Sequence, residues 1–406
     1  MVNEECKHLT DHLTKGYINA YEGNGCFFES TLDNTPKFLY DQPLYAFVHS
    51  FSRRGCLFCE HCFRPVGSLM DNINHLIQQL YPKLSVDTCH LIAPHNVHFT
   101  QTTFHCEACN SPFCSSSCLK ASDSFHKFIC QKLSPTESEG LKDLQSYALR
   151  TNENFYFIGI IYMTIIAKVL DNNERLDHFI IELSEYYDVS WEEVPPKGDT
   201  TEEFGSAKYE SALYAHGLLI SIVRRHMEMI PQAYAEVTRK FFSFDYYLHL
   251  LGKIELVSIE IEIENPLNRH LTRLMENPSI RGALGEKLDN IKRFLYGLDI
   301  NDDVDIQSIE LPDILGVGIY KSLSLLNHSC QPNIEFDYVD NNTARVQLLR
   351  PVSAGEQATI SYVDATLPLE KRRRELWDNY LFICRCQRCL EEDGNEIHEI
   401  SETVAE

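Results

Sequence analysis

Basic residues are scarce in this sequence relative to acidic ones. Its 406 residues include 36 Lys and Arg against 59 Asp and Glu, so the formal net charge is -23. Proteins engage phosphate backbones mainly through Lys and Arg, and residues 56–135 contain no dense basic run, so direct DNA binding is not expected. The charge favours basic partners, since opposite potentials speed encounter, although acidity can also serve solubility alone.

The sequence also lacks an apolar run long enough to cross a membrane. Its most apolar stretch, Phe155–Leu170, contains Thr164 and Lys168 and falls short of the ~20 apolar residues that a membrane helix needs. We therefore expect a buried helix there and no membrane association. The residues MVNEECKHLTDHL at the N-terminus have neither an apolar core nor a small-residue cleavage site, which argues against a secretory signal. We expect the protein in the cytoplasm, the nucleus or both.

No internal repeat or low-complexity tract is present, and the pattern of apolar residues changes along the chain. Residues 16–50 alternate apolar and polar residues between Gly and Pro, as short strands do. From 139 to 298 the apolar spacing of three and four residues predicts helices, with an acidic, proline-containing loop near 191–205. Strand-like segments resume at 316–362, before a short helix predicted in PLEKRRRELWDNYLF. The expected fold class is α+β, with more than one core or a long insertion.

Fifteen cysteines are many for a chain without a secretory signal. Their C-x-x-C spacing indicates zinc thiolates in a reducing compartment, because zinc takes four sulfur or imidazole ligands and such pairs hold one ion from a single turn. The order of the pairs predicts two interleaved sites, whose metal would supply folding free energy to a small domain. One site comprises Cys59, Cys62, Cys114 and Cys118, and the other Cys106, Cys109, His126 and Cys130.

A third zinc site is predicted near the C-terminus. Cys384, Cys386 and Cys389 supply three ligands, and Cys330 in NHSCQPN is the candidate for the fourth. This ligand would tie the C-terminal segment to the strand region. The remaining candidates are not expected to bind metal: His61 and His105 are neighbours of ligands, and Cys6, Cys26, Cys56 and Cys89 are buried or free thiols.

Two groups of motifs resemble a known family. The stretch HCEACNSPFCSSSCLKASDSFHKFIC resembles the MYND zinc finger, although 43 residues separate Cys62 from Cys106. The stretches SLLNHSCQPNIEF, AGEQATISYVD and YLFICRCQRC, with EGNGCFF near the N-terminus, resemble SET-domain methyltransferases. The chain is therefore similar to the SET and MYND family of protein lysine methyltransferases, in a short form without the large C-terminal helical domain of many members.

The resemblance implies a fold and a domain order. The fold would be a SET-domain β-fold of several small sheets, with an embedded zinc-binding MYND finger, a helical insertion and a cysteine-rich post-SET segment. The expected divisions are 1–55 for the N-terminal part of the SET domain, 56–135 for the zinc finger with its long internal insertion, 136–310 for the mainly helical insertion with a SET strand near 250–262, 311–365 for the C-terminal SET core, and 366–406 for the post-SET zinc segment and acidic tail.

The resemblance also implies S-adenosylmethionine as methyl donor, beside three zinc ions. By matched position, the donor site would comprise Glu22, Gly23, Asn24, Gly25, Ser324, Asn327, His328, Tyr362 and Phe382. Tyr362 would lie at the methyl-transfer point, where holding two reactants in line lowers the barrier. Tyr380 would form another wall of the lysine channel and contact its cationic side. Tyr362 and Tyr380 are therefore the predicted catalytic residues.

Two functions are compatible with these motifs. One is an S-adenosylmethionine-dependent protein-lysine N-methyltransferase that acts on an exposed lysine of a histone or another basic protein. The other is a catalytically weak or inactive adaptor whose zinc finger binds proline-containing peptides. The second stays open because the family places an asparagine in the donor pocket, whereas GKIELVSIEIE is followed by none until Asn265. We expect a monomer in either case.

The one compact basic run, Lys371–Arg374, could be a nuclear address or a substrate contact. It lies in a helical pattern between Glu370 and Glu375, so we expect a solvated helix face.

Overall fold

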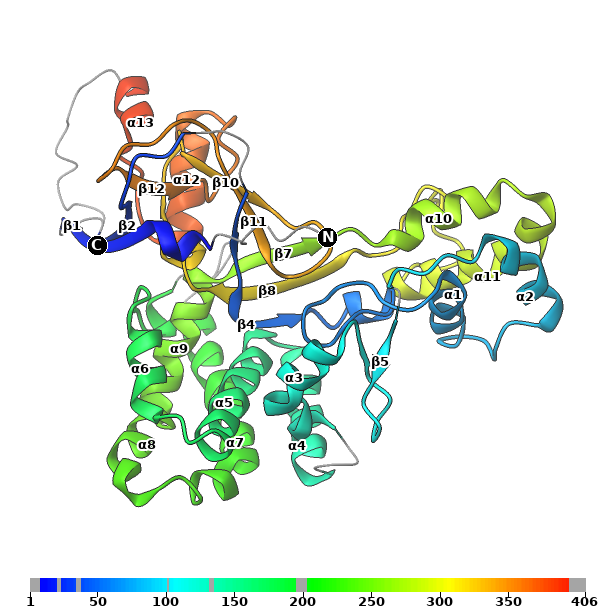
Figure 1. Cartoon of the computed structure of the whole chain (residues 1–406), viewed down its shortest axis with the longest axis horizontal. Helices are drawn as coiled ribbons and strands as arrows, with labels where there is room; N and C mark the ends of the chain where they lie inside the picture. Colours follow the sequence, from blue (N-terminus) through cyan, green and yellow to red (C-terminus); the bar gives the residue numbers. More distant parts are fainter. Residues whose placement is uncertain are drawn as a thin grey trace.

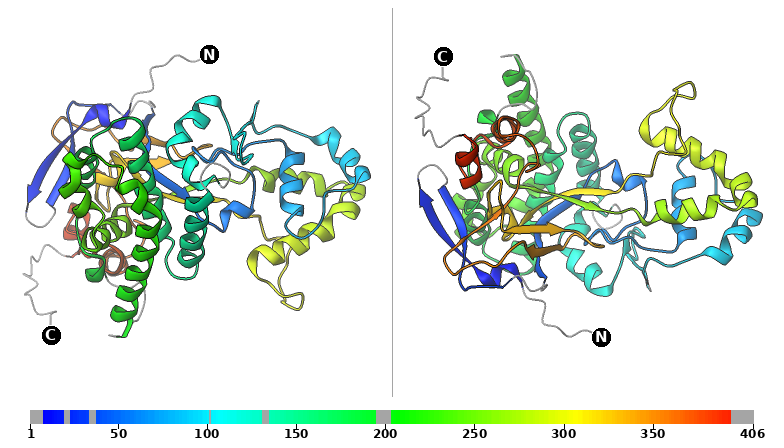
Figure 2. Two further views of the ribbon diagram at one scale, coloured as in Figure 1. Left: turned by 90° about the horizontal axis from the view of Figure 1, so that it is seen from below. Right: turned by 90° about the horizontal axis from the view of Figure 1, so that it is seen from above.

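The computed structural model describes residues 8–19, 23–33, 38–100, 102–130, 135–194 and 203–393. In these ranges, strands from both ends of the chain form small sheets next to a helical block, and a second group of helices projects to one side (Figure 1). Views from below and above show the same projecting group (Figure 2). The predicted α+β class with several small sheets is confirmed.

The strands in the described ranges form four sheets. The first has the order β1 (Leu13–Asn19), β2 (Gly23–Phe28), β12 (Gln357–Ile360) and β9 (Asn327–His328). The second has the order β10 (Ile334–Asp337), β11 (Ala344–Leu348) and β3 (Leu39–Asp41). The third has the order β4 (Pro43–Val48), β8 (Ile314–Tyr320) and β7 (Ile259–Ile263), and the fourth pairs β5 (Phe104–His105) with β6 (Pro112–Phe113).

The first sheet brings motifs from the two ends of the sequence together. β12 pairs with β2 in antiparallel fashion, so that Ala358 lies opposite Cys26. β12 also pairs with β9 in parallel fashion, so that Thr359 lies opposite Asn327. The motifs EGNGCFF, NHSC and ATISY therefore occupy neighbouring strands, although about 300 residues separate the first from the others.

The third sheet separates two hydrophobic cores. On β4, Phe47 belongs to the core of the helical block, whereas Val48 belongs to the core on the opposite face. On β7, Ile261 and Ile263 lie in this second core, and the intervening Glu262 is exposed. This alternation follows from the two-residue period of a strand, which sends successive side chains to opposite faces.

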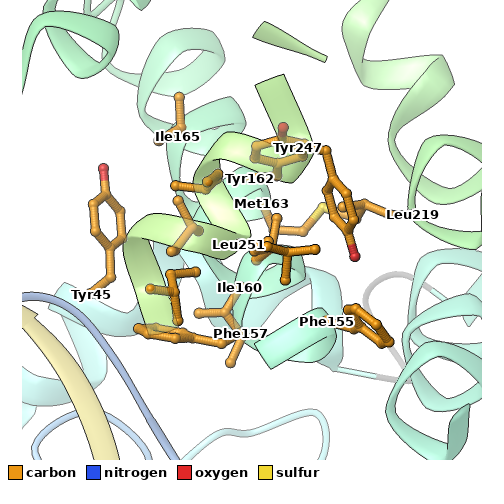
Figure 3. Packing of buried hydrophobic residues seen from close by; sticks show 14 of the residues in the cluster. Tyr45, Phe155, Phe157, Ile160, Tyr162, Met163, Ile165, Leu219, Tyr247 and Leu251 are labelled. Atoms are coloured by element: carbon orange, nitrogen blue, oxygen red, sulfur yellow. The ribbon is translucent and has the colours of Figure 1, made fainter. Parts of the chain in front are cut away.

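The helical block is built around one apolar helix. Its members are α3 (Ser116–Ile129), α4 (Pro135–Ala148), α5 (Asn154–Asp171), α6 (Leu176–Ser184), α7 (Glu203–Met227), α8 (Ala235–Phe241) and α9 (Phe244–Val257). By length and composition α5 could cross a membrane, but 72% of that window is buried inside the fold. Phe157 and Met163 of α5 pack near Leu219 and Leu251 (Figure 3), and Tyr162 donates a hydrogen bond to the Phe241 carbonyl at 2.9 Å. The prediction of a buried helix is confirmed.

A side lobe explains the long stretch between Cys62 and Cys106. That stretch forms α1 (Leu69–Ile77) and α2 (Val86–Ile92), which pack against α10 (Pro266–Met275) and α11 (Pro278–Tyr296). Asn290 of α11 donates a hydrogen bond to the Tyr81 hydroxyl at 2.8 Å. Segments almost 200 residues apart therefore build one lobe, which is the projecting group with α1, α2, α10 and α11 in Figures 1 and 2.

The remaining helical elements are short or lie near the C-terminus. They are α12 (Leu369–Tyr380), α13 (Gln387–Glu392) and the 3-10 turns Leu9–His12, Ser52–Arg54, Ala93–His95, Trp191–Glu193, Gln232–Tyr234 and Leu323–Leu325.

Because α9 packs closely against the loop after α6, one methyl group added at this contact should lower the stability of the fold. A Cβ at Gly252 would lie 2.1 Å from the Val189 carbonyl oxygen, whereas a Cβ at Gly282 of α11 would meet open space. We expect Gly252→Ala to lower the free energy of unfolding by about 1–3 kcal/mol, measured by urea denaturation. Gly282→Ala should instead raise it by ~0.5–1 kcal/mol, because alanine loses less backbone entropy in a helix. Equal stabilities of the two variants would contradict the packing described for α9.

Candidate active site and metal centres

Among the described residues, twelve side chains gather in three groups of four, and the ligand atoms within each group lie within 4.8 Å of one another. The groups match the three predicted sets: Cys59, Cys62, Cys114 and Cys118; Cys106, Cys109, His126 and Cys130; Cys330, Cys384, Cys386 and Cys389. Each offers four sulfur or imidazole donors, which is the ligand set that structural zinc takes. All three groups therefore fit zinc.

The other cysteines and histidines in the described ranges do not join these groups, as predicted for His61 and His105. Cys26 and Cys56 are buried thiols, and Cys89 is partly buried. Cys6 lies outside the described residues.

The backbone explains how each C-x-x-C pair converges. Phe63 donates its N–H to the Cys59 carbonyl at 2.9 Å, and Asn110 donates to the Cys106 carbonyl at 2.8 Å. Both residues have φ near +65°, the left-handed conformation that closes a tight turn. Each turn therefore directs its two sulfurs toward one point.

Helix α3 and the residues at its two ends supply the remaining ligands of the two finger sites, with Cys114 just before the N-cap. Its N-cap, Ser115, accepts a hydrogen bond from the Cys118 N–H at 3.0 Å, which satisfies a free donor of the first turn. Cys118 then lies at the start of the helix, and His126 and Cys130 lie at its end. One helix thus connects the two interleaved groups.

The third group contains a buried arginine that the sequence did not reveal. The Arg372 side chain is fully buried, and its Nε donates to the Cys330 sulfur at 3.2 Å. The same guanidinium donates to the Cys389 sulfur at 3.6 Å and to the Glu392 carboxylate at 2.6 Å. Because four thiolates around Zn²⁺ would leave a net negative charge, this guanidinium would compensate it and orient two of the ligands.

The prediction that Lys371–Arg374 is a solvated helix face is therefore wrong at Arg372. Lys371 and Arg374 are exposed, whereas Arg372 shares the inner face of α12 with Leu376 and Tyr380. These three residues follow one another at intervals of four, a spacing that puts them on one side of a helix and could have predicted that Arg372 faces inward. The charge of the arginine concealed that signal.

The predicted donor and catalytic residues line one pocket of about 1100 Å³. Its walls come from β1 and β2, the loop after α6, the α9–β7 junction, β9, β12 and the segment after α12. The lining includes Gly23, Asn24, Gly25, Ser324, Asn327, His328, Tyr362, Tyr380 and Phe382. Glu22 lies outside the described residues. All the other residues predicted for the site meet in this pocket.

Two hydrogen bonds hold Tyr362 in place. Its hydroxyl donates to the Leu326 carbonyl at 2.5 Å, and its backbone N–H donates to His328 Nδ1 at 3.0 Å. Its ring lies 4.7 Å from that of Tyr380 and 6.3 Å from that of Phe382, measured between centroids. Burial raises the pKa of Tyr362 above its ordinary value, so the phenol stays protonated at neutral pH.

His328 connects this pocket to the third metal group. Burial lowers the pKa of His328 to about 4, so the ring is neutral at pH 7. Since Nδ1 accepts the Tyr362 N–H, the ring proton is on Nε2, which lies 3.2 Å from the Cys330 sulfur. The ring therefore bridges a predicted zinc ligand and the backbone of the predicted catalytic tyrosine.

The pocket wall formed by β2 and β9 fits a polar ligand. A Cβ at Gly25 would lie 2.6 Å from the Ile18 side chain and 3.2 Å from Asn327 Nδ2, so only glycine leaves this wall open. Asn327 Nδ2 donates to the Asn24 carbonyl at 3.0 Å. Gln357 Nε2 also lines the pocket and is buried without a hydrogen-bond partner among the described residues. The residues present therefore suit a donor such as S-adenosylmethionine, whose amino-acid and adenine parts carry many polar atoms.

Gln357 was not predicted, and its sequence context carries little signal. It is one of several polar residues in AGEQATISY, and its place beside Gly25 depends on the pairing of β12 with β2.

The missing asparagine is a real departure in this pocket. Leu256, Val257, Ser258 and Ile259 line the wall where the α9–β7 junction meets it. Asn265 is buried elsewhere, as the N-cap of α10, and donates to the Pro312 carbonyl at 2.9 Å. Among the described lining residues, Asn24 and Asn327 are the asparagines, and both lie on the glycine side.

The position of Arg372 predicts slower zinc release from the native protein than from Arg372→Met. Loss of an outer-shell partner typically costs ~10–100-fold in metal affinity. We expect one zinc equivalent to leave the variant faster by roughly that factor under a chelator challenge followed with a chromogenic zinc indicator. Arg374→Met on the same helix, where the side chain is 84% exposed, is the matched control. Identical release curves for both variants would contradict the role given to Arg372.

Comparisons with known proteins agree with this geometry. The SET domain family matches residues 148–363, which is more than half of the chain. Histone-lysine N-methyltransferase ATXR2 of Arabidopsis thaliana is 24% identical over 93% of this chain and 90% of its own length. Protein-lysine N-trimethyltransferase SMYD5 of Mus musculus is 24% identical over 93% of this chain and 86% of its own.

A SET and MYND domain-containing protein of Dictyostelium discoideum is 25% identical over 75% of this chain, which spans about half, 51%, of that relative. The relatives that match most of the chain thus carry the names of lysine methyltransferases and of SET and MYND proteins. The chain belongs to the SET-domain family, and its resemblance extends to members with a MYND zinc finger.

Proposed function

We propose that the protein is an S-adenosylmethionine-dependent protein-lysine N-methyltransferase. The observation that carries this proposal is the convergence of Tyr362, Tyr380 and His328 with the glycine wall of β2 in one pocket. Membership of the SET-domain family supports the same activity.

The two ends of the pocket have different chemistry. Gly23–Gly25, Ser324, Asn327 and Phe382 would hold the donor. The donor supplies an electrophilic methyl carbon on a positively charged sulfur. Tyr362 and Tyr380 would enclose the lysine side chain, and the hydrogen bonds of Tyr362 keep its ring from rotating away. Low solvent exposure there favours the neutral amine, which is the nucleophilic form, over the ammonium.

Basic proteins are the proposed substrates. The net charge of -23 favours partners of opposite sign. One relative is named a histone-lysine and another a protein-lysine methyltransferase, so a histone or another basic protein is a suitable class. We further propose a monomer in the cytoplasm, the nucleus or both, whose zinc finger can hold a proline-containing peptide.

One observation favours a second candidate function. Val257 and Ser258 line the pocket where the family pattern has an asparagine, so the donor loses one polar partner. A chain that binds the donor too weakly for turnover would serve as an adaptor that brings proteins together through its zinc finger.

Calorimetric titration of S-adenosylmethionine into the zinc-loaded protein separates the two candidates. We expect micromolar binding by the native chain and a loss of at least roughly 10-fold in His328→Ala, because the ring that positions Tyr362 and contacts Cys330 is removed. Circular dichroism and zinc content of the variant control for the fold. No detectable binding to folded, zinc-loaded native protein would contradict the enzyme and favour the adaptor.

A further inference from the structure

Gln357 of β12 carries a side-chain amide that lines the pocket, and its buried Nε2 has no hydrogen-bond partner among the described residues. We infer that this amide binds the carboxylate of the donor's amino-acid part and replaces the polar contact that the α9–β7 wall lacks. This inference rests on the proposed methyltransferase function and adds a residue to its donor site.

The strand register explains why Gln357 faces the glycine side of the pocket. In the parallel pair of β12 and β9, Thr359 lies opposite Asn327, so these two side chains point to the same face of the sheet. Gln357 is two residues before Thr359 and shares that face, because side chains alternate along a strand. His328 is next to Asn327 and points the other way, with its ring centroid 5.4 Å from that of Tyr362.

Two amide nitrogens lie close together beside Gly25. A Cβ at this glycine would lie 3.1 Å from Gln357 Nε2 and 3.2 Å from Asn327 Nδ2, so both nitrogens border the same bare stretch of backbone. Asn327 donates one of its amide protons to the Asn24 carbonyl at 3.0 Å. Because an amide NH2 group has two protons, the second proton of Asn327 and those of Gln357 can be directed at one ligand group.

A carboxylate is the ligand group that this amide fits. A buried NH2 group without an acceptor costs free energy, which a hydrogen bond to the ligand removes. Of the polar groups of the donor, the carboxylate only accepts hydrogen bonds, whereas the amino group donates and the adenine and ribose do both. The lysine and arginine that line the pocket are already engaged, since Lys15 pairs with Glu185 and Arg385 has an interaction partner of its own. Neutral amides therefore supply the hydrogen bonds to the carboxylate.

This contact offsets the departure at the α9–β7 junction. There, Val257 and Ser258 line the pocket where the family pattern has an asparagine. Gln357 reaches the same pocket from β12, so a side-chain amide that is missing from one wall is present on another. The donor site keeps a polar partner for the amino-acid part in a position that the family pattern did not indicate.

Calorimetry on the full-length, zinc-loaded protein tests the inference with two ligands that differ only in the carboxylate, S-adenosylhomocysteine and its decarboxylated analogue S-adenosyl-3-thiopropylamine. We expect the near-isosteric Gln357→Met to weaken binding of S-adenosylhomocysteine roughly 10- to 100-fold, the effect of losing a hydrogen bond to a charged group. Gln357→Glu should weaken it at least as much, because two carboxylates repel each other. Both variants should bind the decarboxylated analogue no more weakly than native protein does.

Gln347→Met is the matched control, because Gln347 is an exposed residue of β11 that does not line the pocket. Zinc content and circular dichroism check the fold of every variant. Equal weakening of both ligands by Gln357→Met, or unchanged binding of S-adenosylhomocysteine, would overturn the inference and leave the proposed function standing. Folded, zinc-loaded native protein that binds neither ligand would contradict the proposed function itself, and the inference with it.

Discussion

The pocket depends on the position of Cys330. This residue follows β9, which carries Asn327 and His328, and it closes a ligand group with three cysteines from the segment after α12. The end of α12 supplies Tyr380 to the pocket wall, and the segment that follows it supplies Phe382. Zinc bound at this group would therefore hold two walls of the pocket at a fixed separation. The hydrogen bonds from the Tyr362 N–H to His328, and from His328 to the Cys330 sulfur, extend the constraint to the predicted catalytic tyrosine.

The third sheet and the helical block hold the other wall of the pocket. The sheet β4-β8-β7 separates two cores, and its strand β7 leads from the pocket toward the side lobe. Helix α5 anchors the core of the helical block, from which α9 and the loop after α6 reach the pocket wall. The wall formed by α9 and the loop after α6 thus packs on the helical core, and the aromatic wall packs on the cysteines of the third group. Each wall is therefore held in position by the protein itself, whether or not the donor is bound.

Local patterns predicted much of this structure. The spacing of cysteines and histidines led to the three ligand groups, because a C-x-x-C turn determines its own geometry, and the motifs matched to the family met in one pocket. The side lobe was not predicted, since it depends on packing between α1–α2 and α10–α11, which are far apart in sequence. Arg372 was assigned to solvent because its charge outweighed its helical position, although sulfur ligands and Glu392 make burial favourable. Gln357 gained its place only through strand pairing.

The most direct test of the central claim compares native protein with Tyr362→Phe. The initial rate of methyl transfer is measured at saturating S-adenosylmethionine, with core histones as a mixture of basic protein substrates. Methylated lysines are identified by mass spectrometry of the products. The account predicts lysine methylation by the native protein and a rate lower by roughly 100-fold in the variant, with zinc content and unfolding midpoint unchanged, because a small misplacement of reacting groups has an effect of that size. A variant that methylates lysine as fast as the native protein would contradict the account.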